Sequence, residues 1–101
     1  MIRILIVCAG GISTSFLEQK IVEVFDKRGI DANILARSAN DVYDHLDQAD
    51  IVLMAPQVSY MQKELSSLCD EHHVKFAPIP LAVYGQMNGE AVCQMVMDLL
   101  K

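Results

Sequence analysis

Residues 4–15 read Ile4-Leu5-Ile6-Val7-Cys8-Ala9-Gly10-Gly11-Ile12-Ser13-Thr14-Ser15, an apolar run followed by two glycines and three hydroxyl side chains. A continuous apolar run of this length is typical of a parallel strand that is buried on both faces of a sheet. From about Ser13 to Arg28, apolar residues recur at helical spacing, and Gly29 is placed to end that helix. The stretch therefore predicts a buried strand, a glycine-containing turn and an amphipathic helix.

The same alternation continues along the chain. Further strand-like runs occupy residues 33–36, 51–55 and 75–79, and helical patterns occupy about 40–46, 58–71 and 89–100, the last with Asn88 as a possible N-cap. Strands that alternate with helices predict an α/β fold, in which right-handed crossovers place helices on both faces of a parallel sheet. Ligands bind such sheets beyond the carboxyl ends of the strands, which directs attention to the loop after Val7.

Composition narrows the possible functions. The chain of 101 residues is 52% hydrophobic with a formal net charge of -5, so we expect one folded domain over residues 1–101 and no nucleic-acid partner. The longest wholly apolar run, residues 4–9, is far shorter than the roughly 20 residues that span a bilayer, and no secretory signal is recognisable. We therefore expect a cytoplasmic protein.

The loop after the first strand combines a nucleophile with the features of an anion site. Gly10 and Gly11 permit backbone conformations in which successive N–H groups turn inward, and the following helix N-terminus adds unpaired N–H groups and positive partial charge. A phosphate group fits this description, and the same field favours the thiolate form of Cys8. The alternative is a plain strand-to-helix turn, in which a hydroxyl caps the helix and Cys8 only ends the strand.

Other phosphate motifs fit the loop less well. The chain lacks a Gly-Lys-Ser/Thr ending and a GxGxxG pattern, and Thr14 stands where a cysteine phosphatase needs an arginine. Amides and hydroxyls can still support attack by a thiolate on phosphorus, and no side chain near the loop is dedicated to activating water. A phosphoryl carrier is therefore favoured over two rivals, a phosphatase or arsenate-reductase-like enzyme and a non-covalent anion sensor.

Three segments carry a resemblance to a known family: the loop at residues 8–15, Ala55-Pro56-Gln57-Val58-Ser59-Tyr60-Met61, and Val83-Tyr84-Gly85-Gln86-Met87-Asn88-Gly89. They resemble the lactose/cellobiose class of enzyme IIB components of the bacterial phosphoenolpyruvate-dependent sugar phosphotransferase system (PTS). The resemblance implies a four-stranded parallel sheet in the order 2-1-3-4, with a phosphatase-like phosphate loop after the first strand. It also implies a phosphocysteine at Cys8 and phosphate contacts from Ala9, Gly10, Gly11, Ile12, Ser13, Thr14 and Ser15.

The resemblance further implies two protein partners. The phosphoryl group would arrive from a phosphohistidine on a IIA partner and leave to a disaccharide held by the membrane-embedded IIC partner, so the protein would work transiently at the inner face of the membrane. We expect a monomer without a cofactor. Residues near predicted strand ends are candidates for partner contacts, although each tyrosine among them could equally be packed inside: Pro56, Gln57, Tyr60 and Tyr84.

Other reactive or charged residues have less specific interpretations. Cys69 and Cys93 are expected to be small buried hydrophobes in a reduced compartment. His72 and His73 could form a metal cluster with Cys69, four residues before His73 on the predicted helix, but a helix-end histidine without a metal is the commoner case. His45 is expected at the surface, and Asp41, Asp44, Asp47 and Asp50 form an acidic face that is either solvated or a docking site for a basic partner surface.

Overall fold

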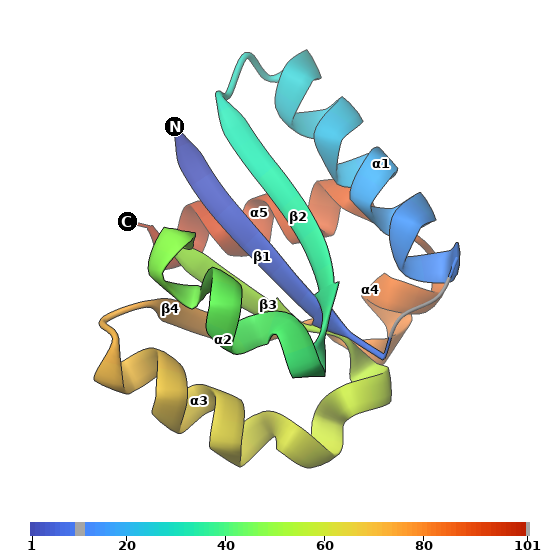
Figure 1. Ribbon diagram of the computed structural model, residues 1–101. Helices are drawn as coiled ribbons and strands as arrows, with labels where there is room; N and C mark the ends of the chain where they lie inside the picture. The colour runs from blue at the N-terminus through green and yellow to red at the C-terminus, as the bar shows by residue number, and fades with distance from the viewer. Residues whose placement is uncertain (10–11, 101) are drawn as a thin grey trace.

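Four parallel strands form a single sheet in the computed structural model, which describes residues 1–9 and 12–100, with only the backbone for residues 12–14 (Figure 1). The strands are β1 (Ile2–Cys8), β2 (Ala32–Ser38), β3 (Ile51–Met54) and β4 (Lys75–Pro78). Their order is β2-β1-β3-β4 and every pairing is parallel. The predicted α/β class and the order 2-1-3-4 are both confirmed.

Helices cover both faces of the sheet. The long helices α1 (Ile12–Lys27) and α5 (Gly89–Leu99) pack on one face, against Ile4, Ile6 and Cys8 of β1. On the other face α2 (Val42–His45) and α3 (Gln62–Glu71) pack against Leu5 and Val7. Figure 1 shows α5 passing behind the strands and α2 in front of them. Successive residues of β1 thus point to opposite layers, and both are apolar because both faces are covered.

Two predicted helices differ from expectation in their form. The segment expected to be one helix over residues 40–46 is instead α2 between two 3-10 turns, Ala39–Asp41 and Leu46–Gln48. The helix expected from residue 58 begins earlier, as a 3-10 stretch over Pro56–Met61 that is kinked at Val58 (φ -113°, ψ 25°) before α3 starts. Only Val42 and Leu46 in the first segment are fully buried, so packing has too few anchors to hold a longer regular helix.

One helix is missing from the sequence prediction altogether. α4 (Leu81–Gly85) begins right after Pro80, two residues beyond the end of β4, and its five residues are too few to show a helical period. The last helix begins as predicted, because the Asn88 side chain accepts a hydrogen bond of 3.1 Å from the Ala91 N–H. The first residue of α5 is Gly89, where an added Cβ would lie 2.7 Å from the Lys20 carbonyl oxygen. A glycine there lets α5 approach α1 closely.

The amino end of the sheet is tied by an ion pair. The Asp50 carboxylate, just before β3, accepts a hydrogen bond from the Arg3 backbone N–H at 2.8 Å and from Arg3 Nη2 at 3.0 Å. These bonds from Arg3 hold the pKa of the Asp50 carboxyl below its usual value. Because Arg3 lies on β1, the pair fixes the alignment of β1 and β3 at the end of the sheet away from Cys8.

Candidate functional site at the carboxyl end of β1

Cys8 is the last residue of β1, one of the two inner strands of the sheet. Its side chain is 4% exposed and belongs to the core layer shared with α1 and α5. The thiol donates a hydrogen bond of 3.4 Å to the Arg37 carbonyl oxygen on β2. The sulfur therefore lies at the seam between the two strands, where the chain leaves β1 for the first helix.

The N-terminus of α1 follows Cys8 almost immediately. Ala9 is exposed, α1 begins at Ile12, and no acidic side chain occupies its first turn. The first N–H groups of a helix have no partner within the helix and carry positive partial charge, so this end suits an anion. Figure 1 shows that the end of β1, the start of α1, α4 and the turn after β3 gather at one side of the molecule.

The predicted phosphate contacts are described to different extents. Gly10 and Gly11 lie outside the described residues, and Ile12, Ser13 and Thr14 form the first turn of α1, with only their backbone described. Ser15 follows in that turn with an exposed side chain. Which of these amides and hydroxyls would contact a phosphate stays a prediction.

Strand β2 places two further residues beside the Cys8 thiol. The sequence patterns did not predict either of them. Ser38 is the register partner of Cys8 on β2, and its hydroxyl donates a hydrogen bond of 3.2 Å to Asp41 Oδ2. Arg37 supplies the carbonyl oxygen that accepts the thiol, while its Nη1 donates to the Ala36 carbonyl oxygen at 2.8 Å. Only the alignment of the two strands shows that these residues are neighbours, because Ser38 lies thirty positions after Cys8 in the chain.

The candidate partner-contact residues divide by exposure. Tyr60 is 80% exposed in the turn after β3, where Gln57 is exposed and Pro56 is half-buried. Tyr84 is only 6% exposed and packs in the core layer of α1 and α5. Of the two interpretations given above, its side chain is therefore packed inside the protein and is not exposed to a partner. Two exposed apolar side chains near this end were not predicted: Phe16 in α1 and Leu81 at the start of α4.

A family model agrees with this arrangement. Residues 3–95 match the model described as the PTS system, lactose/cellobiose specific IIB subunit, which is most of the chain. The chain belongs to this IIB family. It is accordingly a phosphotransferase component of a sugar-transport system, which confirms the resemblance of the three sequence segments.

Individual relatives extend the match to the full length of the chain. The oligo-beta-mannoside-specific EIIB component of Bacillus subtilis is 30% identical over 99% of this chain and 97% of its own length. A lactose-specific EIICB component of Lacticaseibacillus casei is 27% identical over 94% of this chain, which corresponds to 17% of that longer protein. The solution structure of a cellobiose-specific IIB component from Borrelia burgdorferi is 34% identical, with a TM-score of 0.81 over 97% of this chain and 90% of that one.

The other two cysteines of this IIB protein are buried, as the sequence analysis predicts. Both are at most 1% exposed, and burial raises the pKa of the Cys69 thiol to about 11 and raises that of Cys93 as well. A buried neutral thiol is a poor nucleophile. Cys8 is buried as well, but of the three it is the one that ends a strand in front of a helix.

The histidines do not form the cluster that sequence spacing left open. α3 ends at Glu71, so His73, with φ of 57°, does not share a helix with Cys69, and the four-residue spacing does not bring the two side chains to one helix face. His72 instead lies 3.3 Å from the Asp47 carboxylate. Within residues 1–9 and 12–100, no three histidine, cysteine or acidic side chains group as a metal site.

The acidic face is less uniform than its three-residue period indicates. Asp50 is bound by Arg3, Asp47 lies beside His72, and Asp41 accepts the Ser38 hydroxyl. Only the last of these three contacts belongs to the Cys8 end of the sheet.

Along the part of the chain that the structure describes, no helix is long and apolar enough to cross a membrane.

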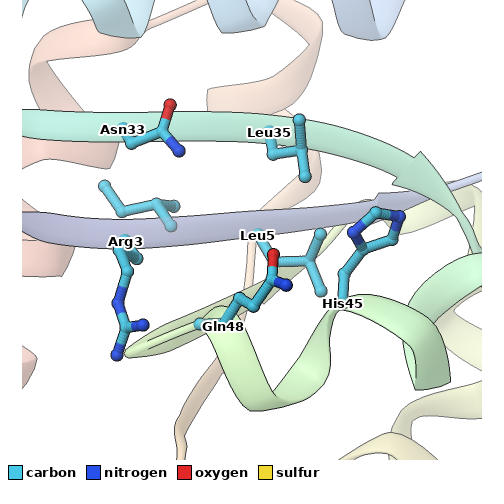
Figure 2. A pocket seen from close by; sticks show the side chains of 8 residues that line it. Arg3, Leu5, Asn33, Leu35, His45 and Gln48 are labelled. Carbon is cyan, nitrogen blue, oxygen red and sulfur yellow. The ribbon is translucent and has the colours of Figure 1, made fainter.

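A separate cavity lies on the opposite side of β1 from the thiol. It measures about 230 Å³ and is lined by Arg3 and Leu5 of β1, by strand β2, and by His45 and Gln48 (Figure 2). His45, expected at the surface, is half-buried here. Leu5 points to the α2 and α3 layer, whereas Cys8 points to the α1 and α5 layer, so the cavity and the thiol open on different faces of the sheet.

Proposed function

We propose that this IIB protein carries a phosphoryl group on the sulfur of Cys8. The observation that carries the proposal is the position of the thiol, which ends the inner strand β1 shortly before the N-terminus of α1. Membership of the IIB family supports it, because the family acts in phosphoryl transfer to sugars. The positive end of α1 stabilises the phosphoryl oxygens once the group is on the sulfur.

Two displacement steps complete the carrier cycle. In the first, the Cys8 thiolate attacks the phosphorus of a phosphohistidine on the IIA partner; the S–P bond forms, the P–N bond breaks, and the imidazole keeps the bonding electron pair. In the second, a sugar hydroxyl attacks the phosphocysteine; the O–P bond forms, the S–P bond breaks, and the thiolate returns while the hydroxyl proton is released. Such transfers depend mainly on positioning and on electrostatic stabilisation of the phosphoryl oxygens. The backbone amides and hydroxyls of residues 9–15 supply that stabilisation in our proposal.

The partners in this cycle are a IIA protein and a membrane-embedded IIC protein that holds a disaccharide. The Lacticaseibacillus casei relative supports the second partner, because its name joins IIC and IIB in one component. Both partners must reach Cys8, so both dock at the carboxyl end of the sheet, where Tyr60, Gln57 and Leu81 are exposed. The protein then acts as a monomer in the cytoplasm and meets the membrane through IIC.

Intact mass measurement tests the carrier proposal. The wild type and Cys8→Ser are incubated with phosphoenolpyruvate and the upstream phosphorelay proteins, including a IIA protein that is itself shown to be phosphorylated. The expected result is the gain of one phosphoryl group in the wild type and none in Cys8→Ser. The matched control is Cys93→Ser, which removes a thiol from α5 and leaves phosphoryl acceptance intact.

Three other outcomes would overturn the proposal. No gain of mass in the wild type, with a phosphorylated IIA present, would favour an anion sensor in which Cys8 is never modified. Release of inorganic phosphate from an aryl phosphate by the protein alone would favour a phosphatase. Retention of phosphoryl acceptance by Cys8→Ser would place the carrier atom elsewhere in the chain.

A further inference from the structure

Strand register places a serine hydroxyl beside the cysteine that ends β1. Ser38 on β2 is the direct partner of Cys8 in the parallel ladder, and neighbouring strands lie about 4.8 Å apart. Side chains alternate between the two faces of a sheet, and directly paired residues share a face. Because Cys8 belongs to the α1 and α5 layer, Ser38 projects on that same side, where α1 begins.

The position of the sulfur brings it still closer to Ser38. Cys8 Sγ lies 3.4 Å from the Arg37 carbonyl oxygen, and Arg37 immediately precedes Ser38. Across a planar trans peptide, a carbonyl oxygen lies about 2.8 Å from the Cα atom of the next residue. The sulfur is therefore no more than about 6 Å from the Ser38 Cα atom. A phosphoryl group on that sulfur has oxygens within reach of the Ser38 hydroxyl.

The hydroxyl already has a charged acceptor in the unphosphorylated protein. Ser38 Oγ donates to Asp41 Oδ2 at 3.2 Å, and Asp41 itself is exposed at the surface. A serine hydroxyl has one proton, so it cannot donate to the carboxylate and to a phosphoryl oxygen at the same time. A phosphoryl group adds negative charge and three strong acceptor oxygens, and it repels a nearby carboxylate.

We infer that Ser38 is a phosphate-contacting residue of this protein, whose hydroxyl leaves Asp41 and donates to a phosphoryl oxygen when Cys8 is phosphorylated. The inference rests on the proposed carrier function and adds a ligand from β2 to the loop at residues 9–15. No covalent bond changes at Ser38. The hydroxyl exchanges the exposed Asp41 carboxylate for a phosphoryl oxygen that carries more negative charge, so the difference between the two hydrogen bonds shifts the equilibrium between phosphorylated IIA and phosphorylated IIB toward IIB.

The equilibrium constant of that transfer is the measurement. Wild type, Ser38→Ala, Ser38→Thr and the control Ser66→Ala, an exposed serine of α3, are each equilibrated with limiting phosphorylated IIA and analysed by intact mass. Ser38→Ala removes the bond to the phosphoryl oxygen and also the weaker bond to the exposed Asp41, so the equilibrium constant is expected to fall by their difference, about threefold. Ser38→Thr, which keeps the hydroxyl, is expected to restore most of it, and Ser66→Ala to match the wild type. Thermal melting of each variant shows that the fold is retained.

A double-mutant cycle tests the competition with Asp41. Asp41→Ala frees the Ser38 hydroxyl and removes a negative charge, so the equilibrium constant of phosphoryl transfer from IIA is expected to rise several-fold. In the Ser38→Ala background only the charge effect is left, and the rise is expected to be smaller. Equal effects of Asp41→Ala in both backgrounds would overturn the exchange of acceptors.

The two proposals fail in different ways in these experiments. If Ser38→Ala transfers phosphoryl groups with the same equilibrium constant as Ser66→Ala, Ser38 does not contact the phosphate, although the carrier function stands. If the wild type accepts no phosphoryl group from phosphorylated IIA, the carrier function fails first, and the role of Ser38 fails with it.

Discussion

The two ends of the sheet are built in opposite ways. At the amino end, charged and backbone groups are bound to one another: Asp50 accepts from the backbone and side chain of Arg3, and its own N–H donates to the Arg3 carbonyl oxygen at 2.8 Å. At the carboxyl end, the Cys8 thiol donates a 3.4 Å hydrogen bond to a carbonyl oxygen, a helix begins whose first N–H groups have no partner within that helix, and Tyr60 is 80% exposed. The first end joins strands, whereas the second leaves groups available to a ligand.

This difference separates stability from function along the same strand. Arg3 and Cys8 are both in β1, five residues apart, yet one is bonded to its neighbours by several strong hydrogen bonds and the other is poised to react. Parallel sheets favour this division, because all strand ends that lead into helix N-termini lie on one side. Substitutions of the bonded groups at the amino end should therefore change the free energy of unfolding, and substitutions of exposed groups at the carboxyl end should change phosphoryl transfer.

The largest expected contrast concerns thiol reactivity. Cys69 lies near the amino end of the sheet, at the end of α3, and its thiol has a pKa of about 11, so about one molecule in several thousand carries the thiolate near pH 7.5. Cys8 ends β1 shortly before the N-terminus of α1, and its thiol contacts a backbone carbonyl oxygen of β2. Iodoacetamide at pH 7.5 is expected to label Cys8 at least a hundredfold faster than Cys69, as measured by peptide mass spectrometry over time.

Two controls make the labelling experiment decisive. Cys8→Ser is expected to leave the folded protein almost unlabelled, and unfolding in guanidinium chloride is expected to expose Cys69 and Cys93 to rapid labelling. Equal labelling rates for Cys8 and Cys69 in the folded protein would show that the carboxyl end confers no special reactivity on its thiol.

A second contrast uses two tyrosines at the carboxyl end. Tyr84 is buried in the core, and Tyr84→Ala is expected to lower the free energy of unfolding by about 3 kcal/mol in urea titrations. Tyr60 is exposed, and Tyr60→Ser is expected to change that free energy by no more than about 0.5 kcal/mol while slowing phosphoryl transfer from IIA. A stability loss for Tyr60→Ser as large as that for Tyr84→Ala would contradict the division into packed and docking residues.

Sequence patterns predicted the layers of the fold because buried positions are occupied by apolar residues, whose spacing can be seen in the sequence. Ile4 to Val7 is continuously apolar since β1 is covered on both faces, and the spacing of Leu17, Ile21 and Phe25 follows the buried side of α1. The short helical turns around α2 escaped prediction because their form depends on packing against the sheet. α4 escaped because five residues carry no measurable period.

The site was predictable only where its residues are adjacent in the chain. Cys8 and the start of α1 are neighbours in sequence, and their juxtaposition follows from local structure alone. Ser38 reaches Cys8 through the pairing of two strands, which no local pattern records. Tyr60 and Tyr84 look alike in sequence, since each follows a strand at a similar distance, and only the tertiary packing buries one and exposes the other.

The smallest expected effect tests the amino end. The lowered pKa of Asp50 means that its ionised form binds Arg3 only in the folded protein, so this contribution to stability is present above the unfolded pKa, near 4, and is lost as the pH falls toward the folded value. Asp50→Asn is expected to lower the melting temperature by a few degrees at pH 7. The difference in melting temperature between the wild type and Asp50→Asn is expected to become smaller when the melts are repeated at pH 3.

Asp44→Asn is the matched control for this experiment. Asp44 lies in the preceding helical segment and is exposed, and within residues 1–9 and 12–100 its carboxylate has no hydrogen bond or ion pair, so its melting temperature should follow that of the wild type at both pH values. A gap for Asp50→Asn that stayed constant from pH 7 to pH 3 would mean that ionisation of Asp50 contributes nothing to stability. Phosphoryl acceptance by Asp50→Asn should equal that of the wild type at pH 7, because the ion pair lies at the opposite end of β1 from Cys8.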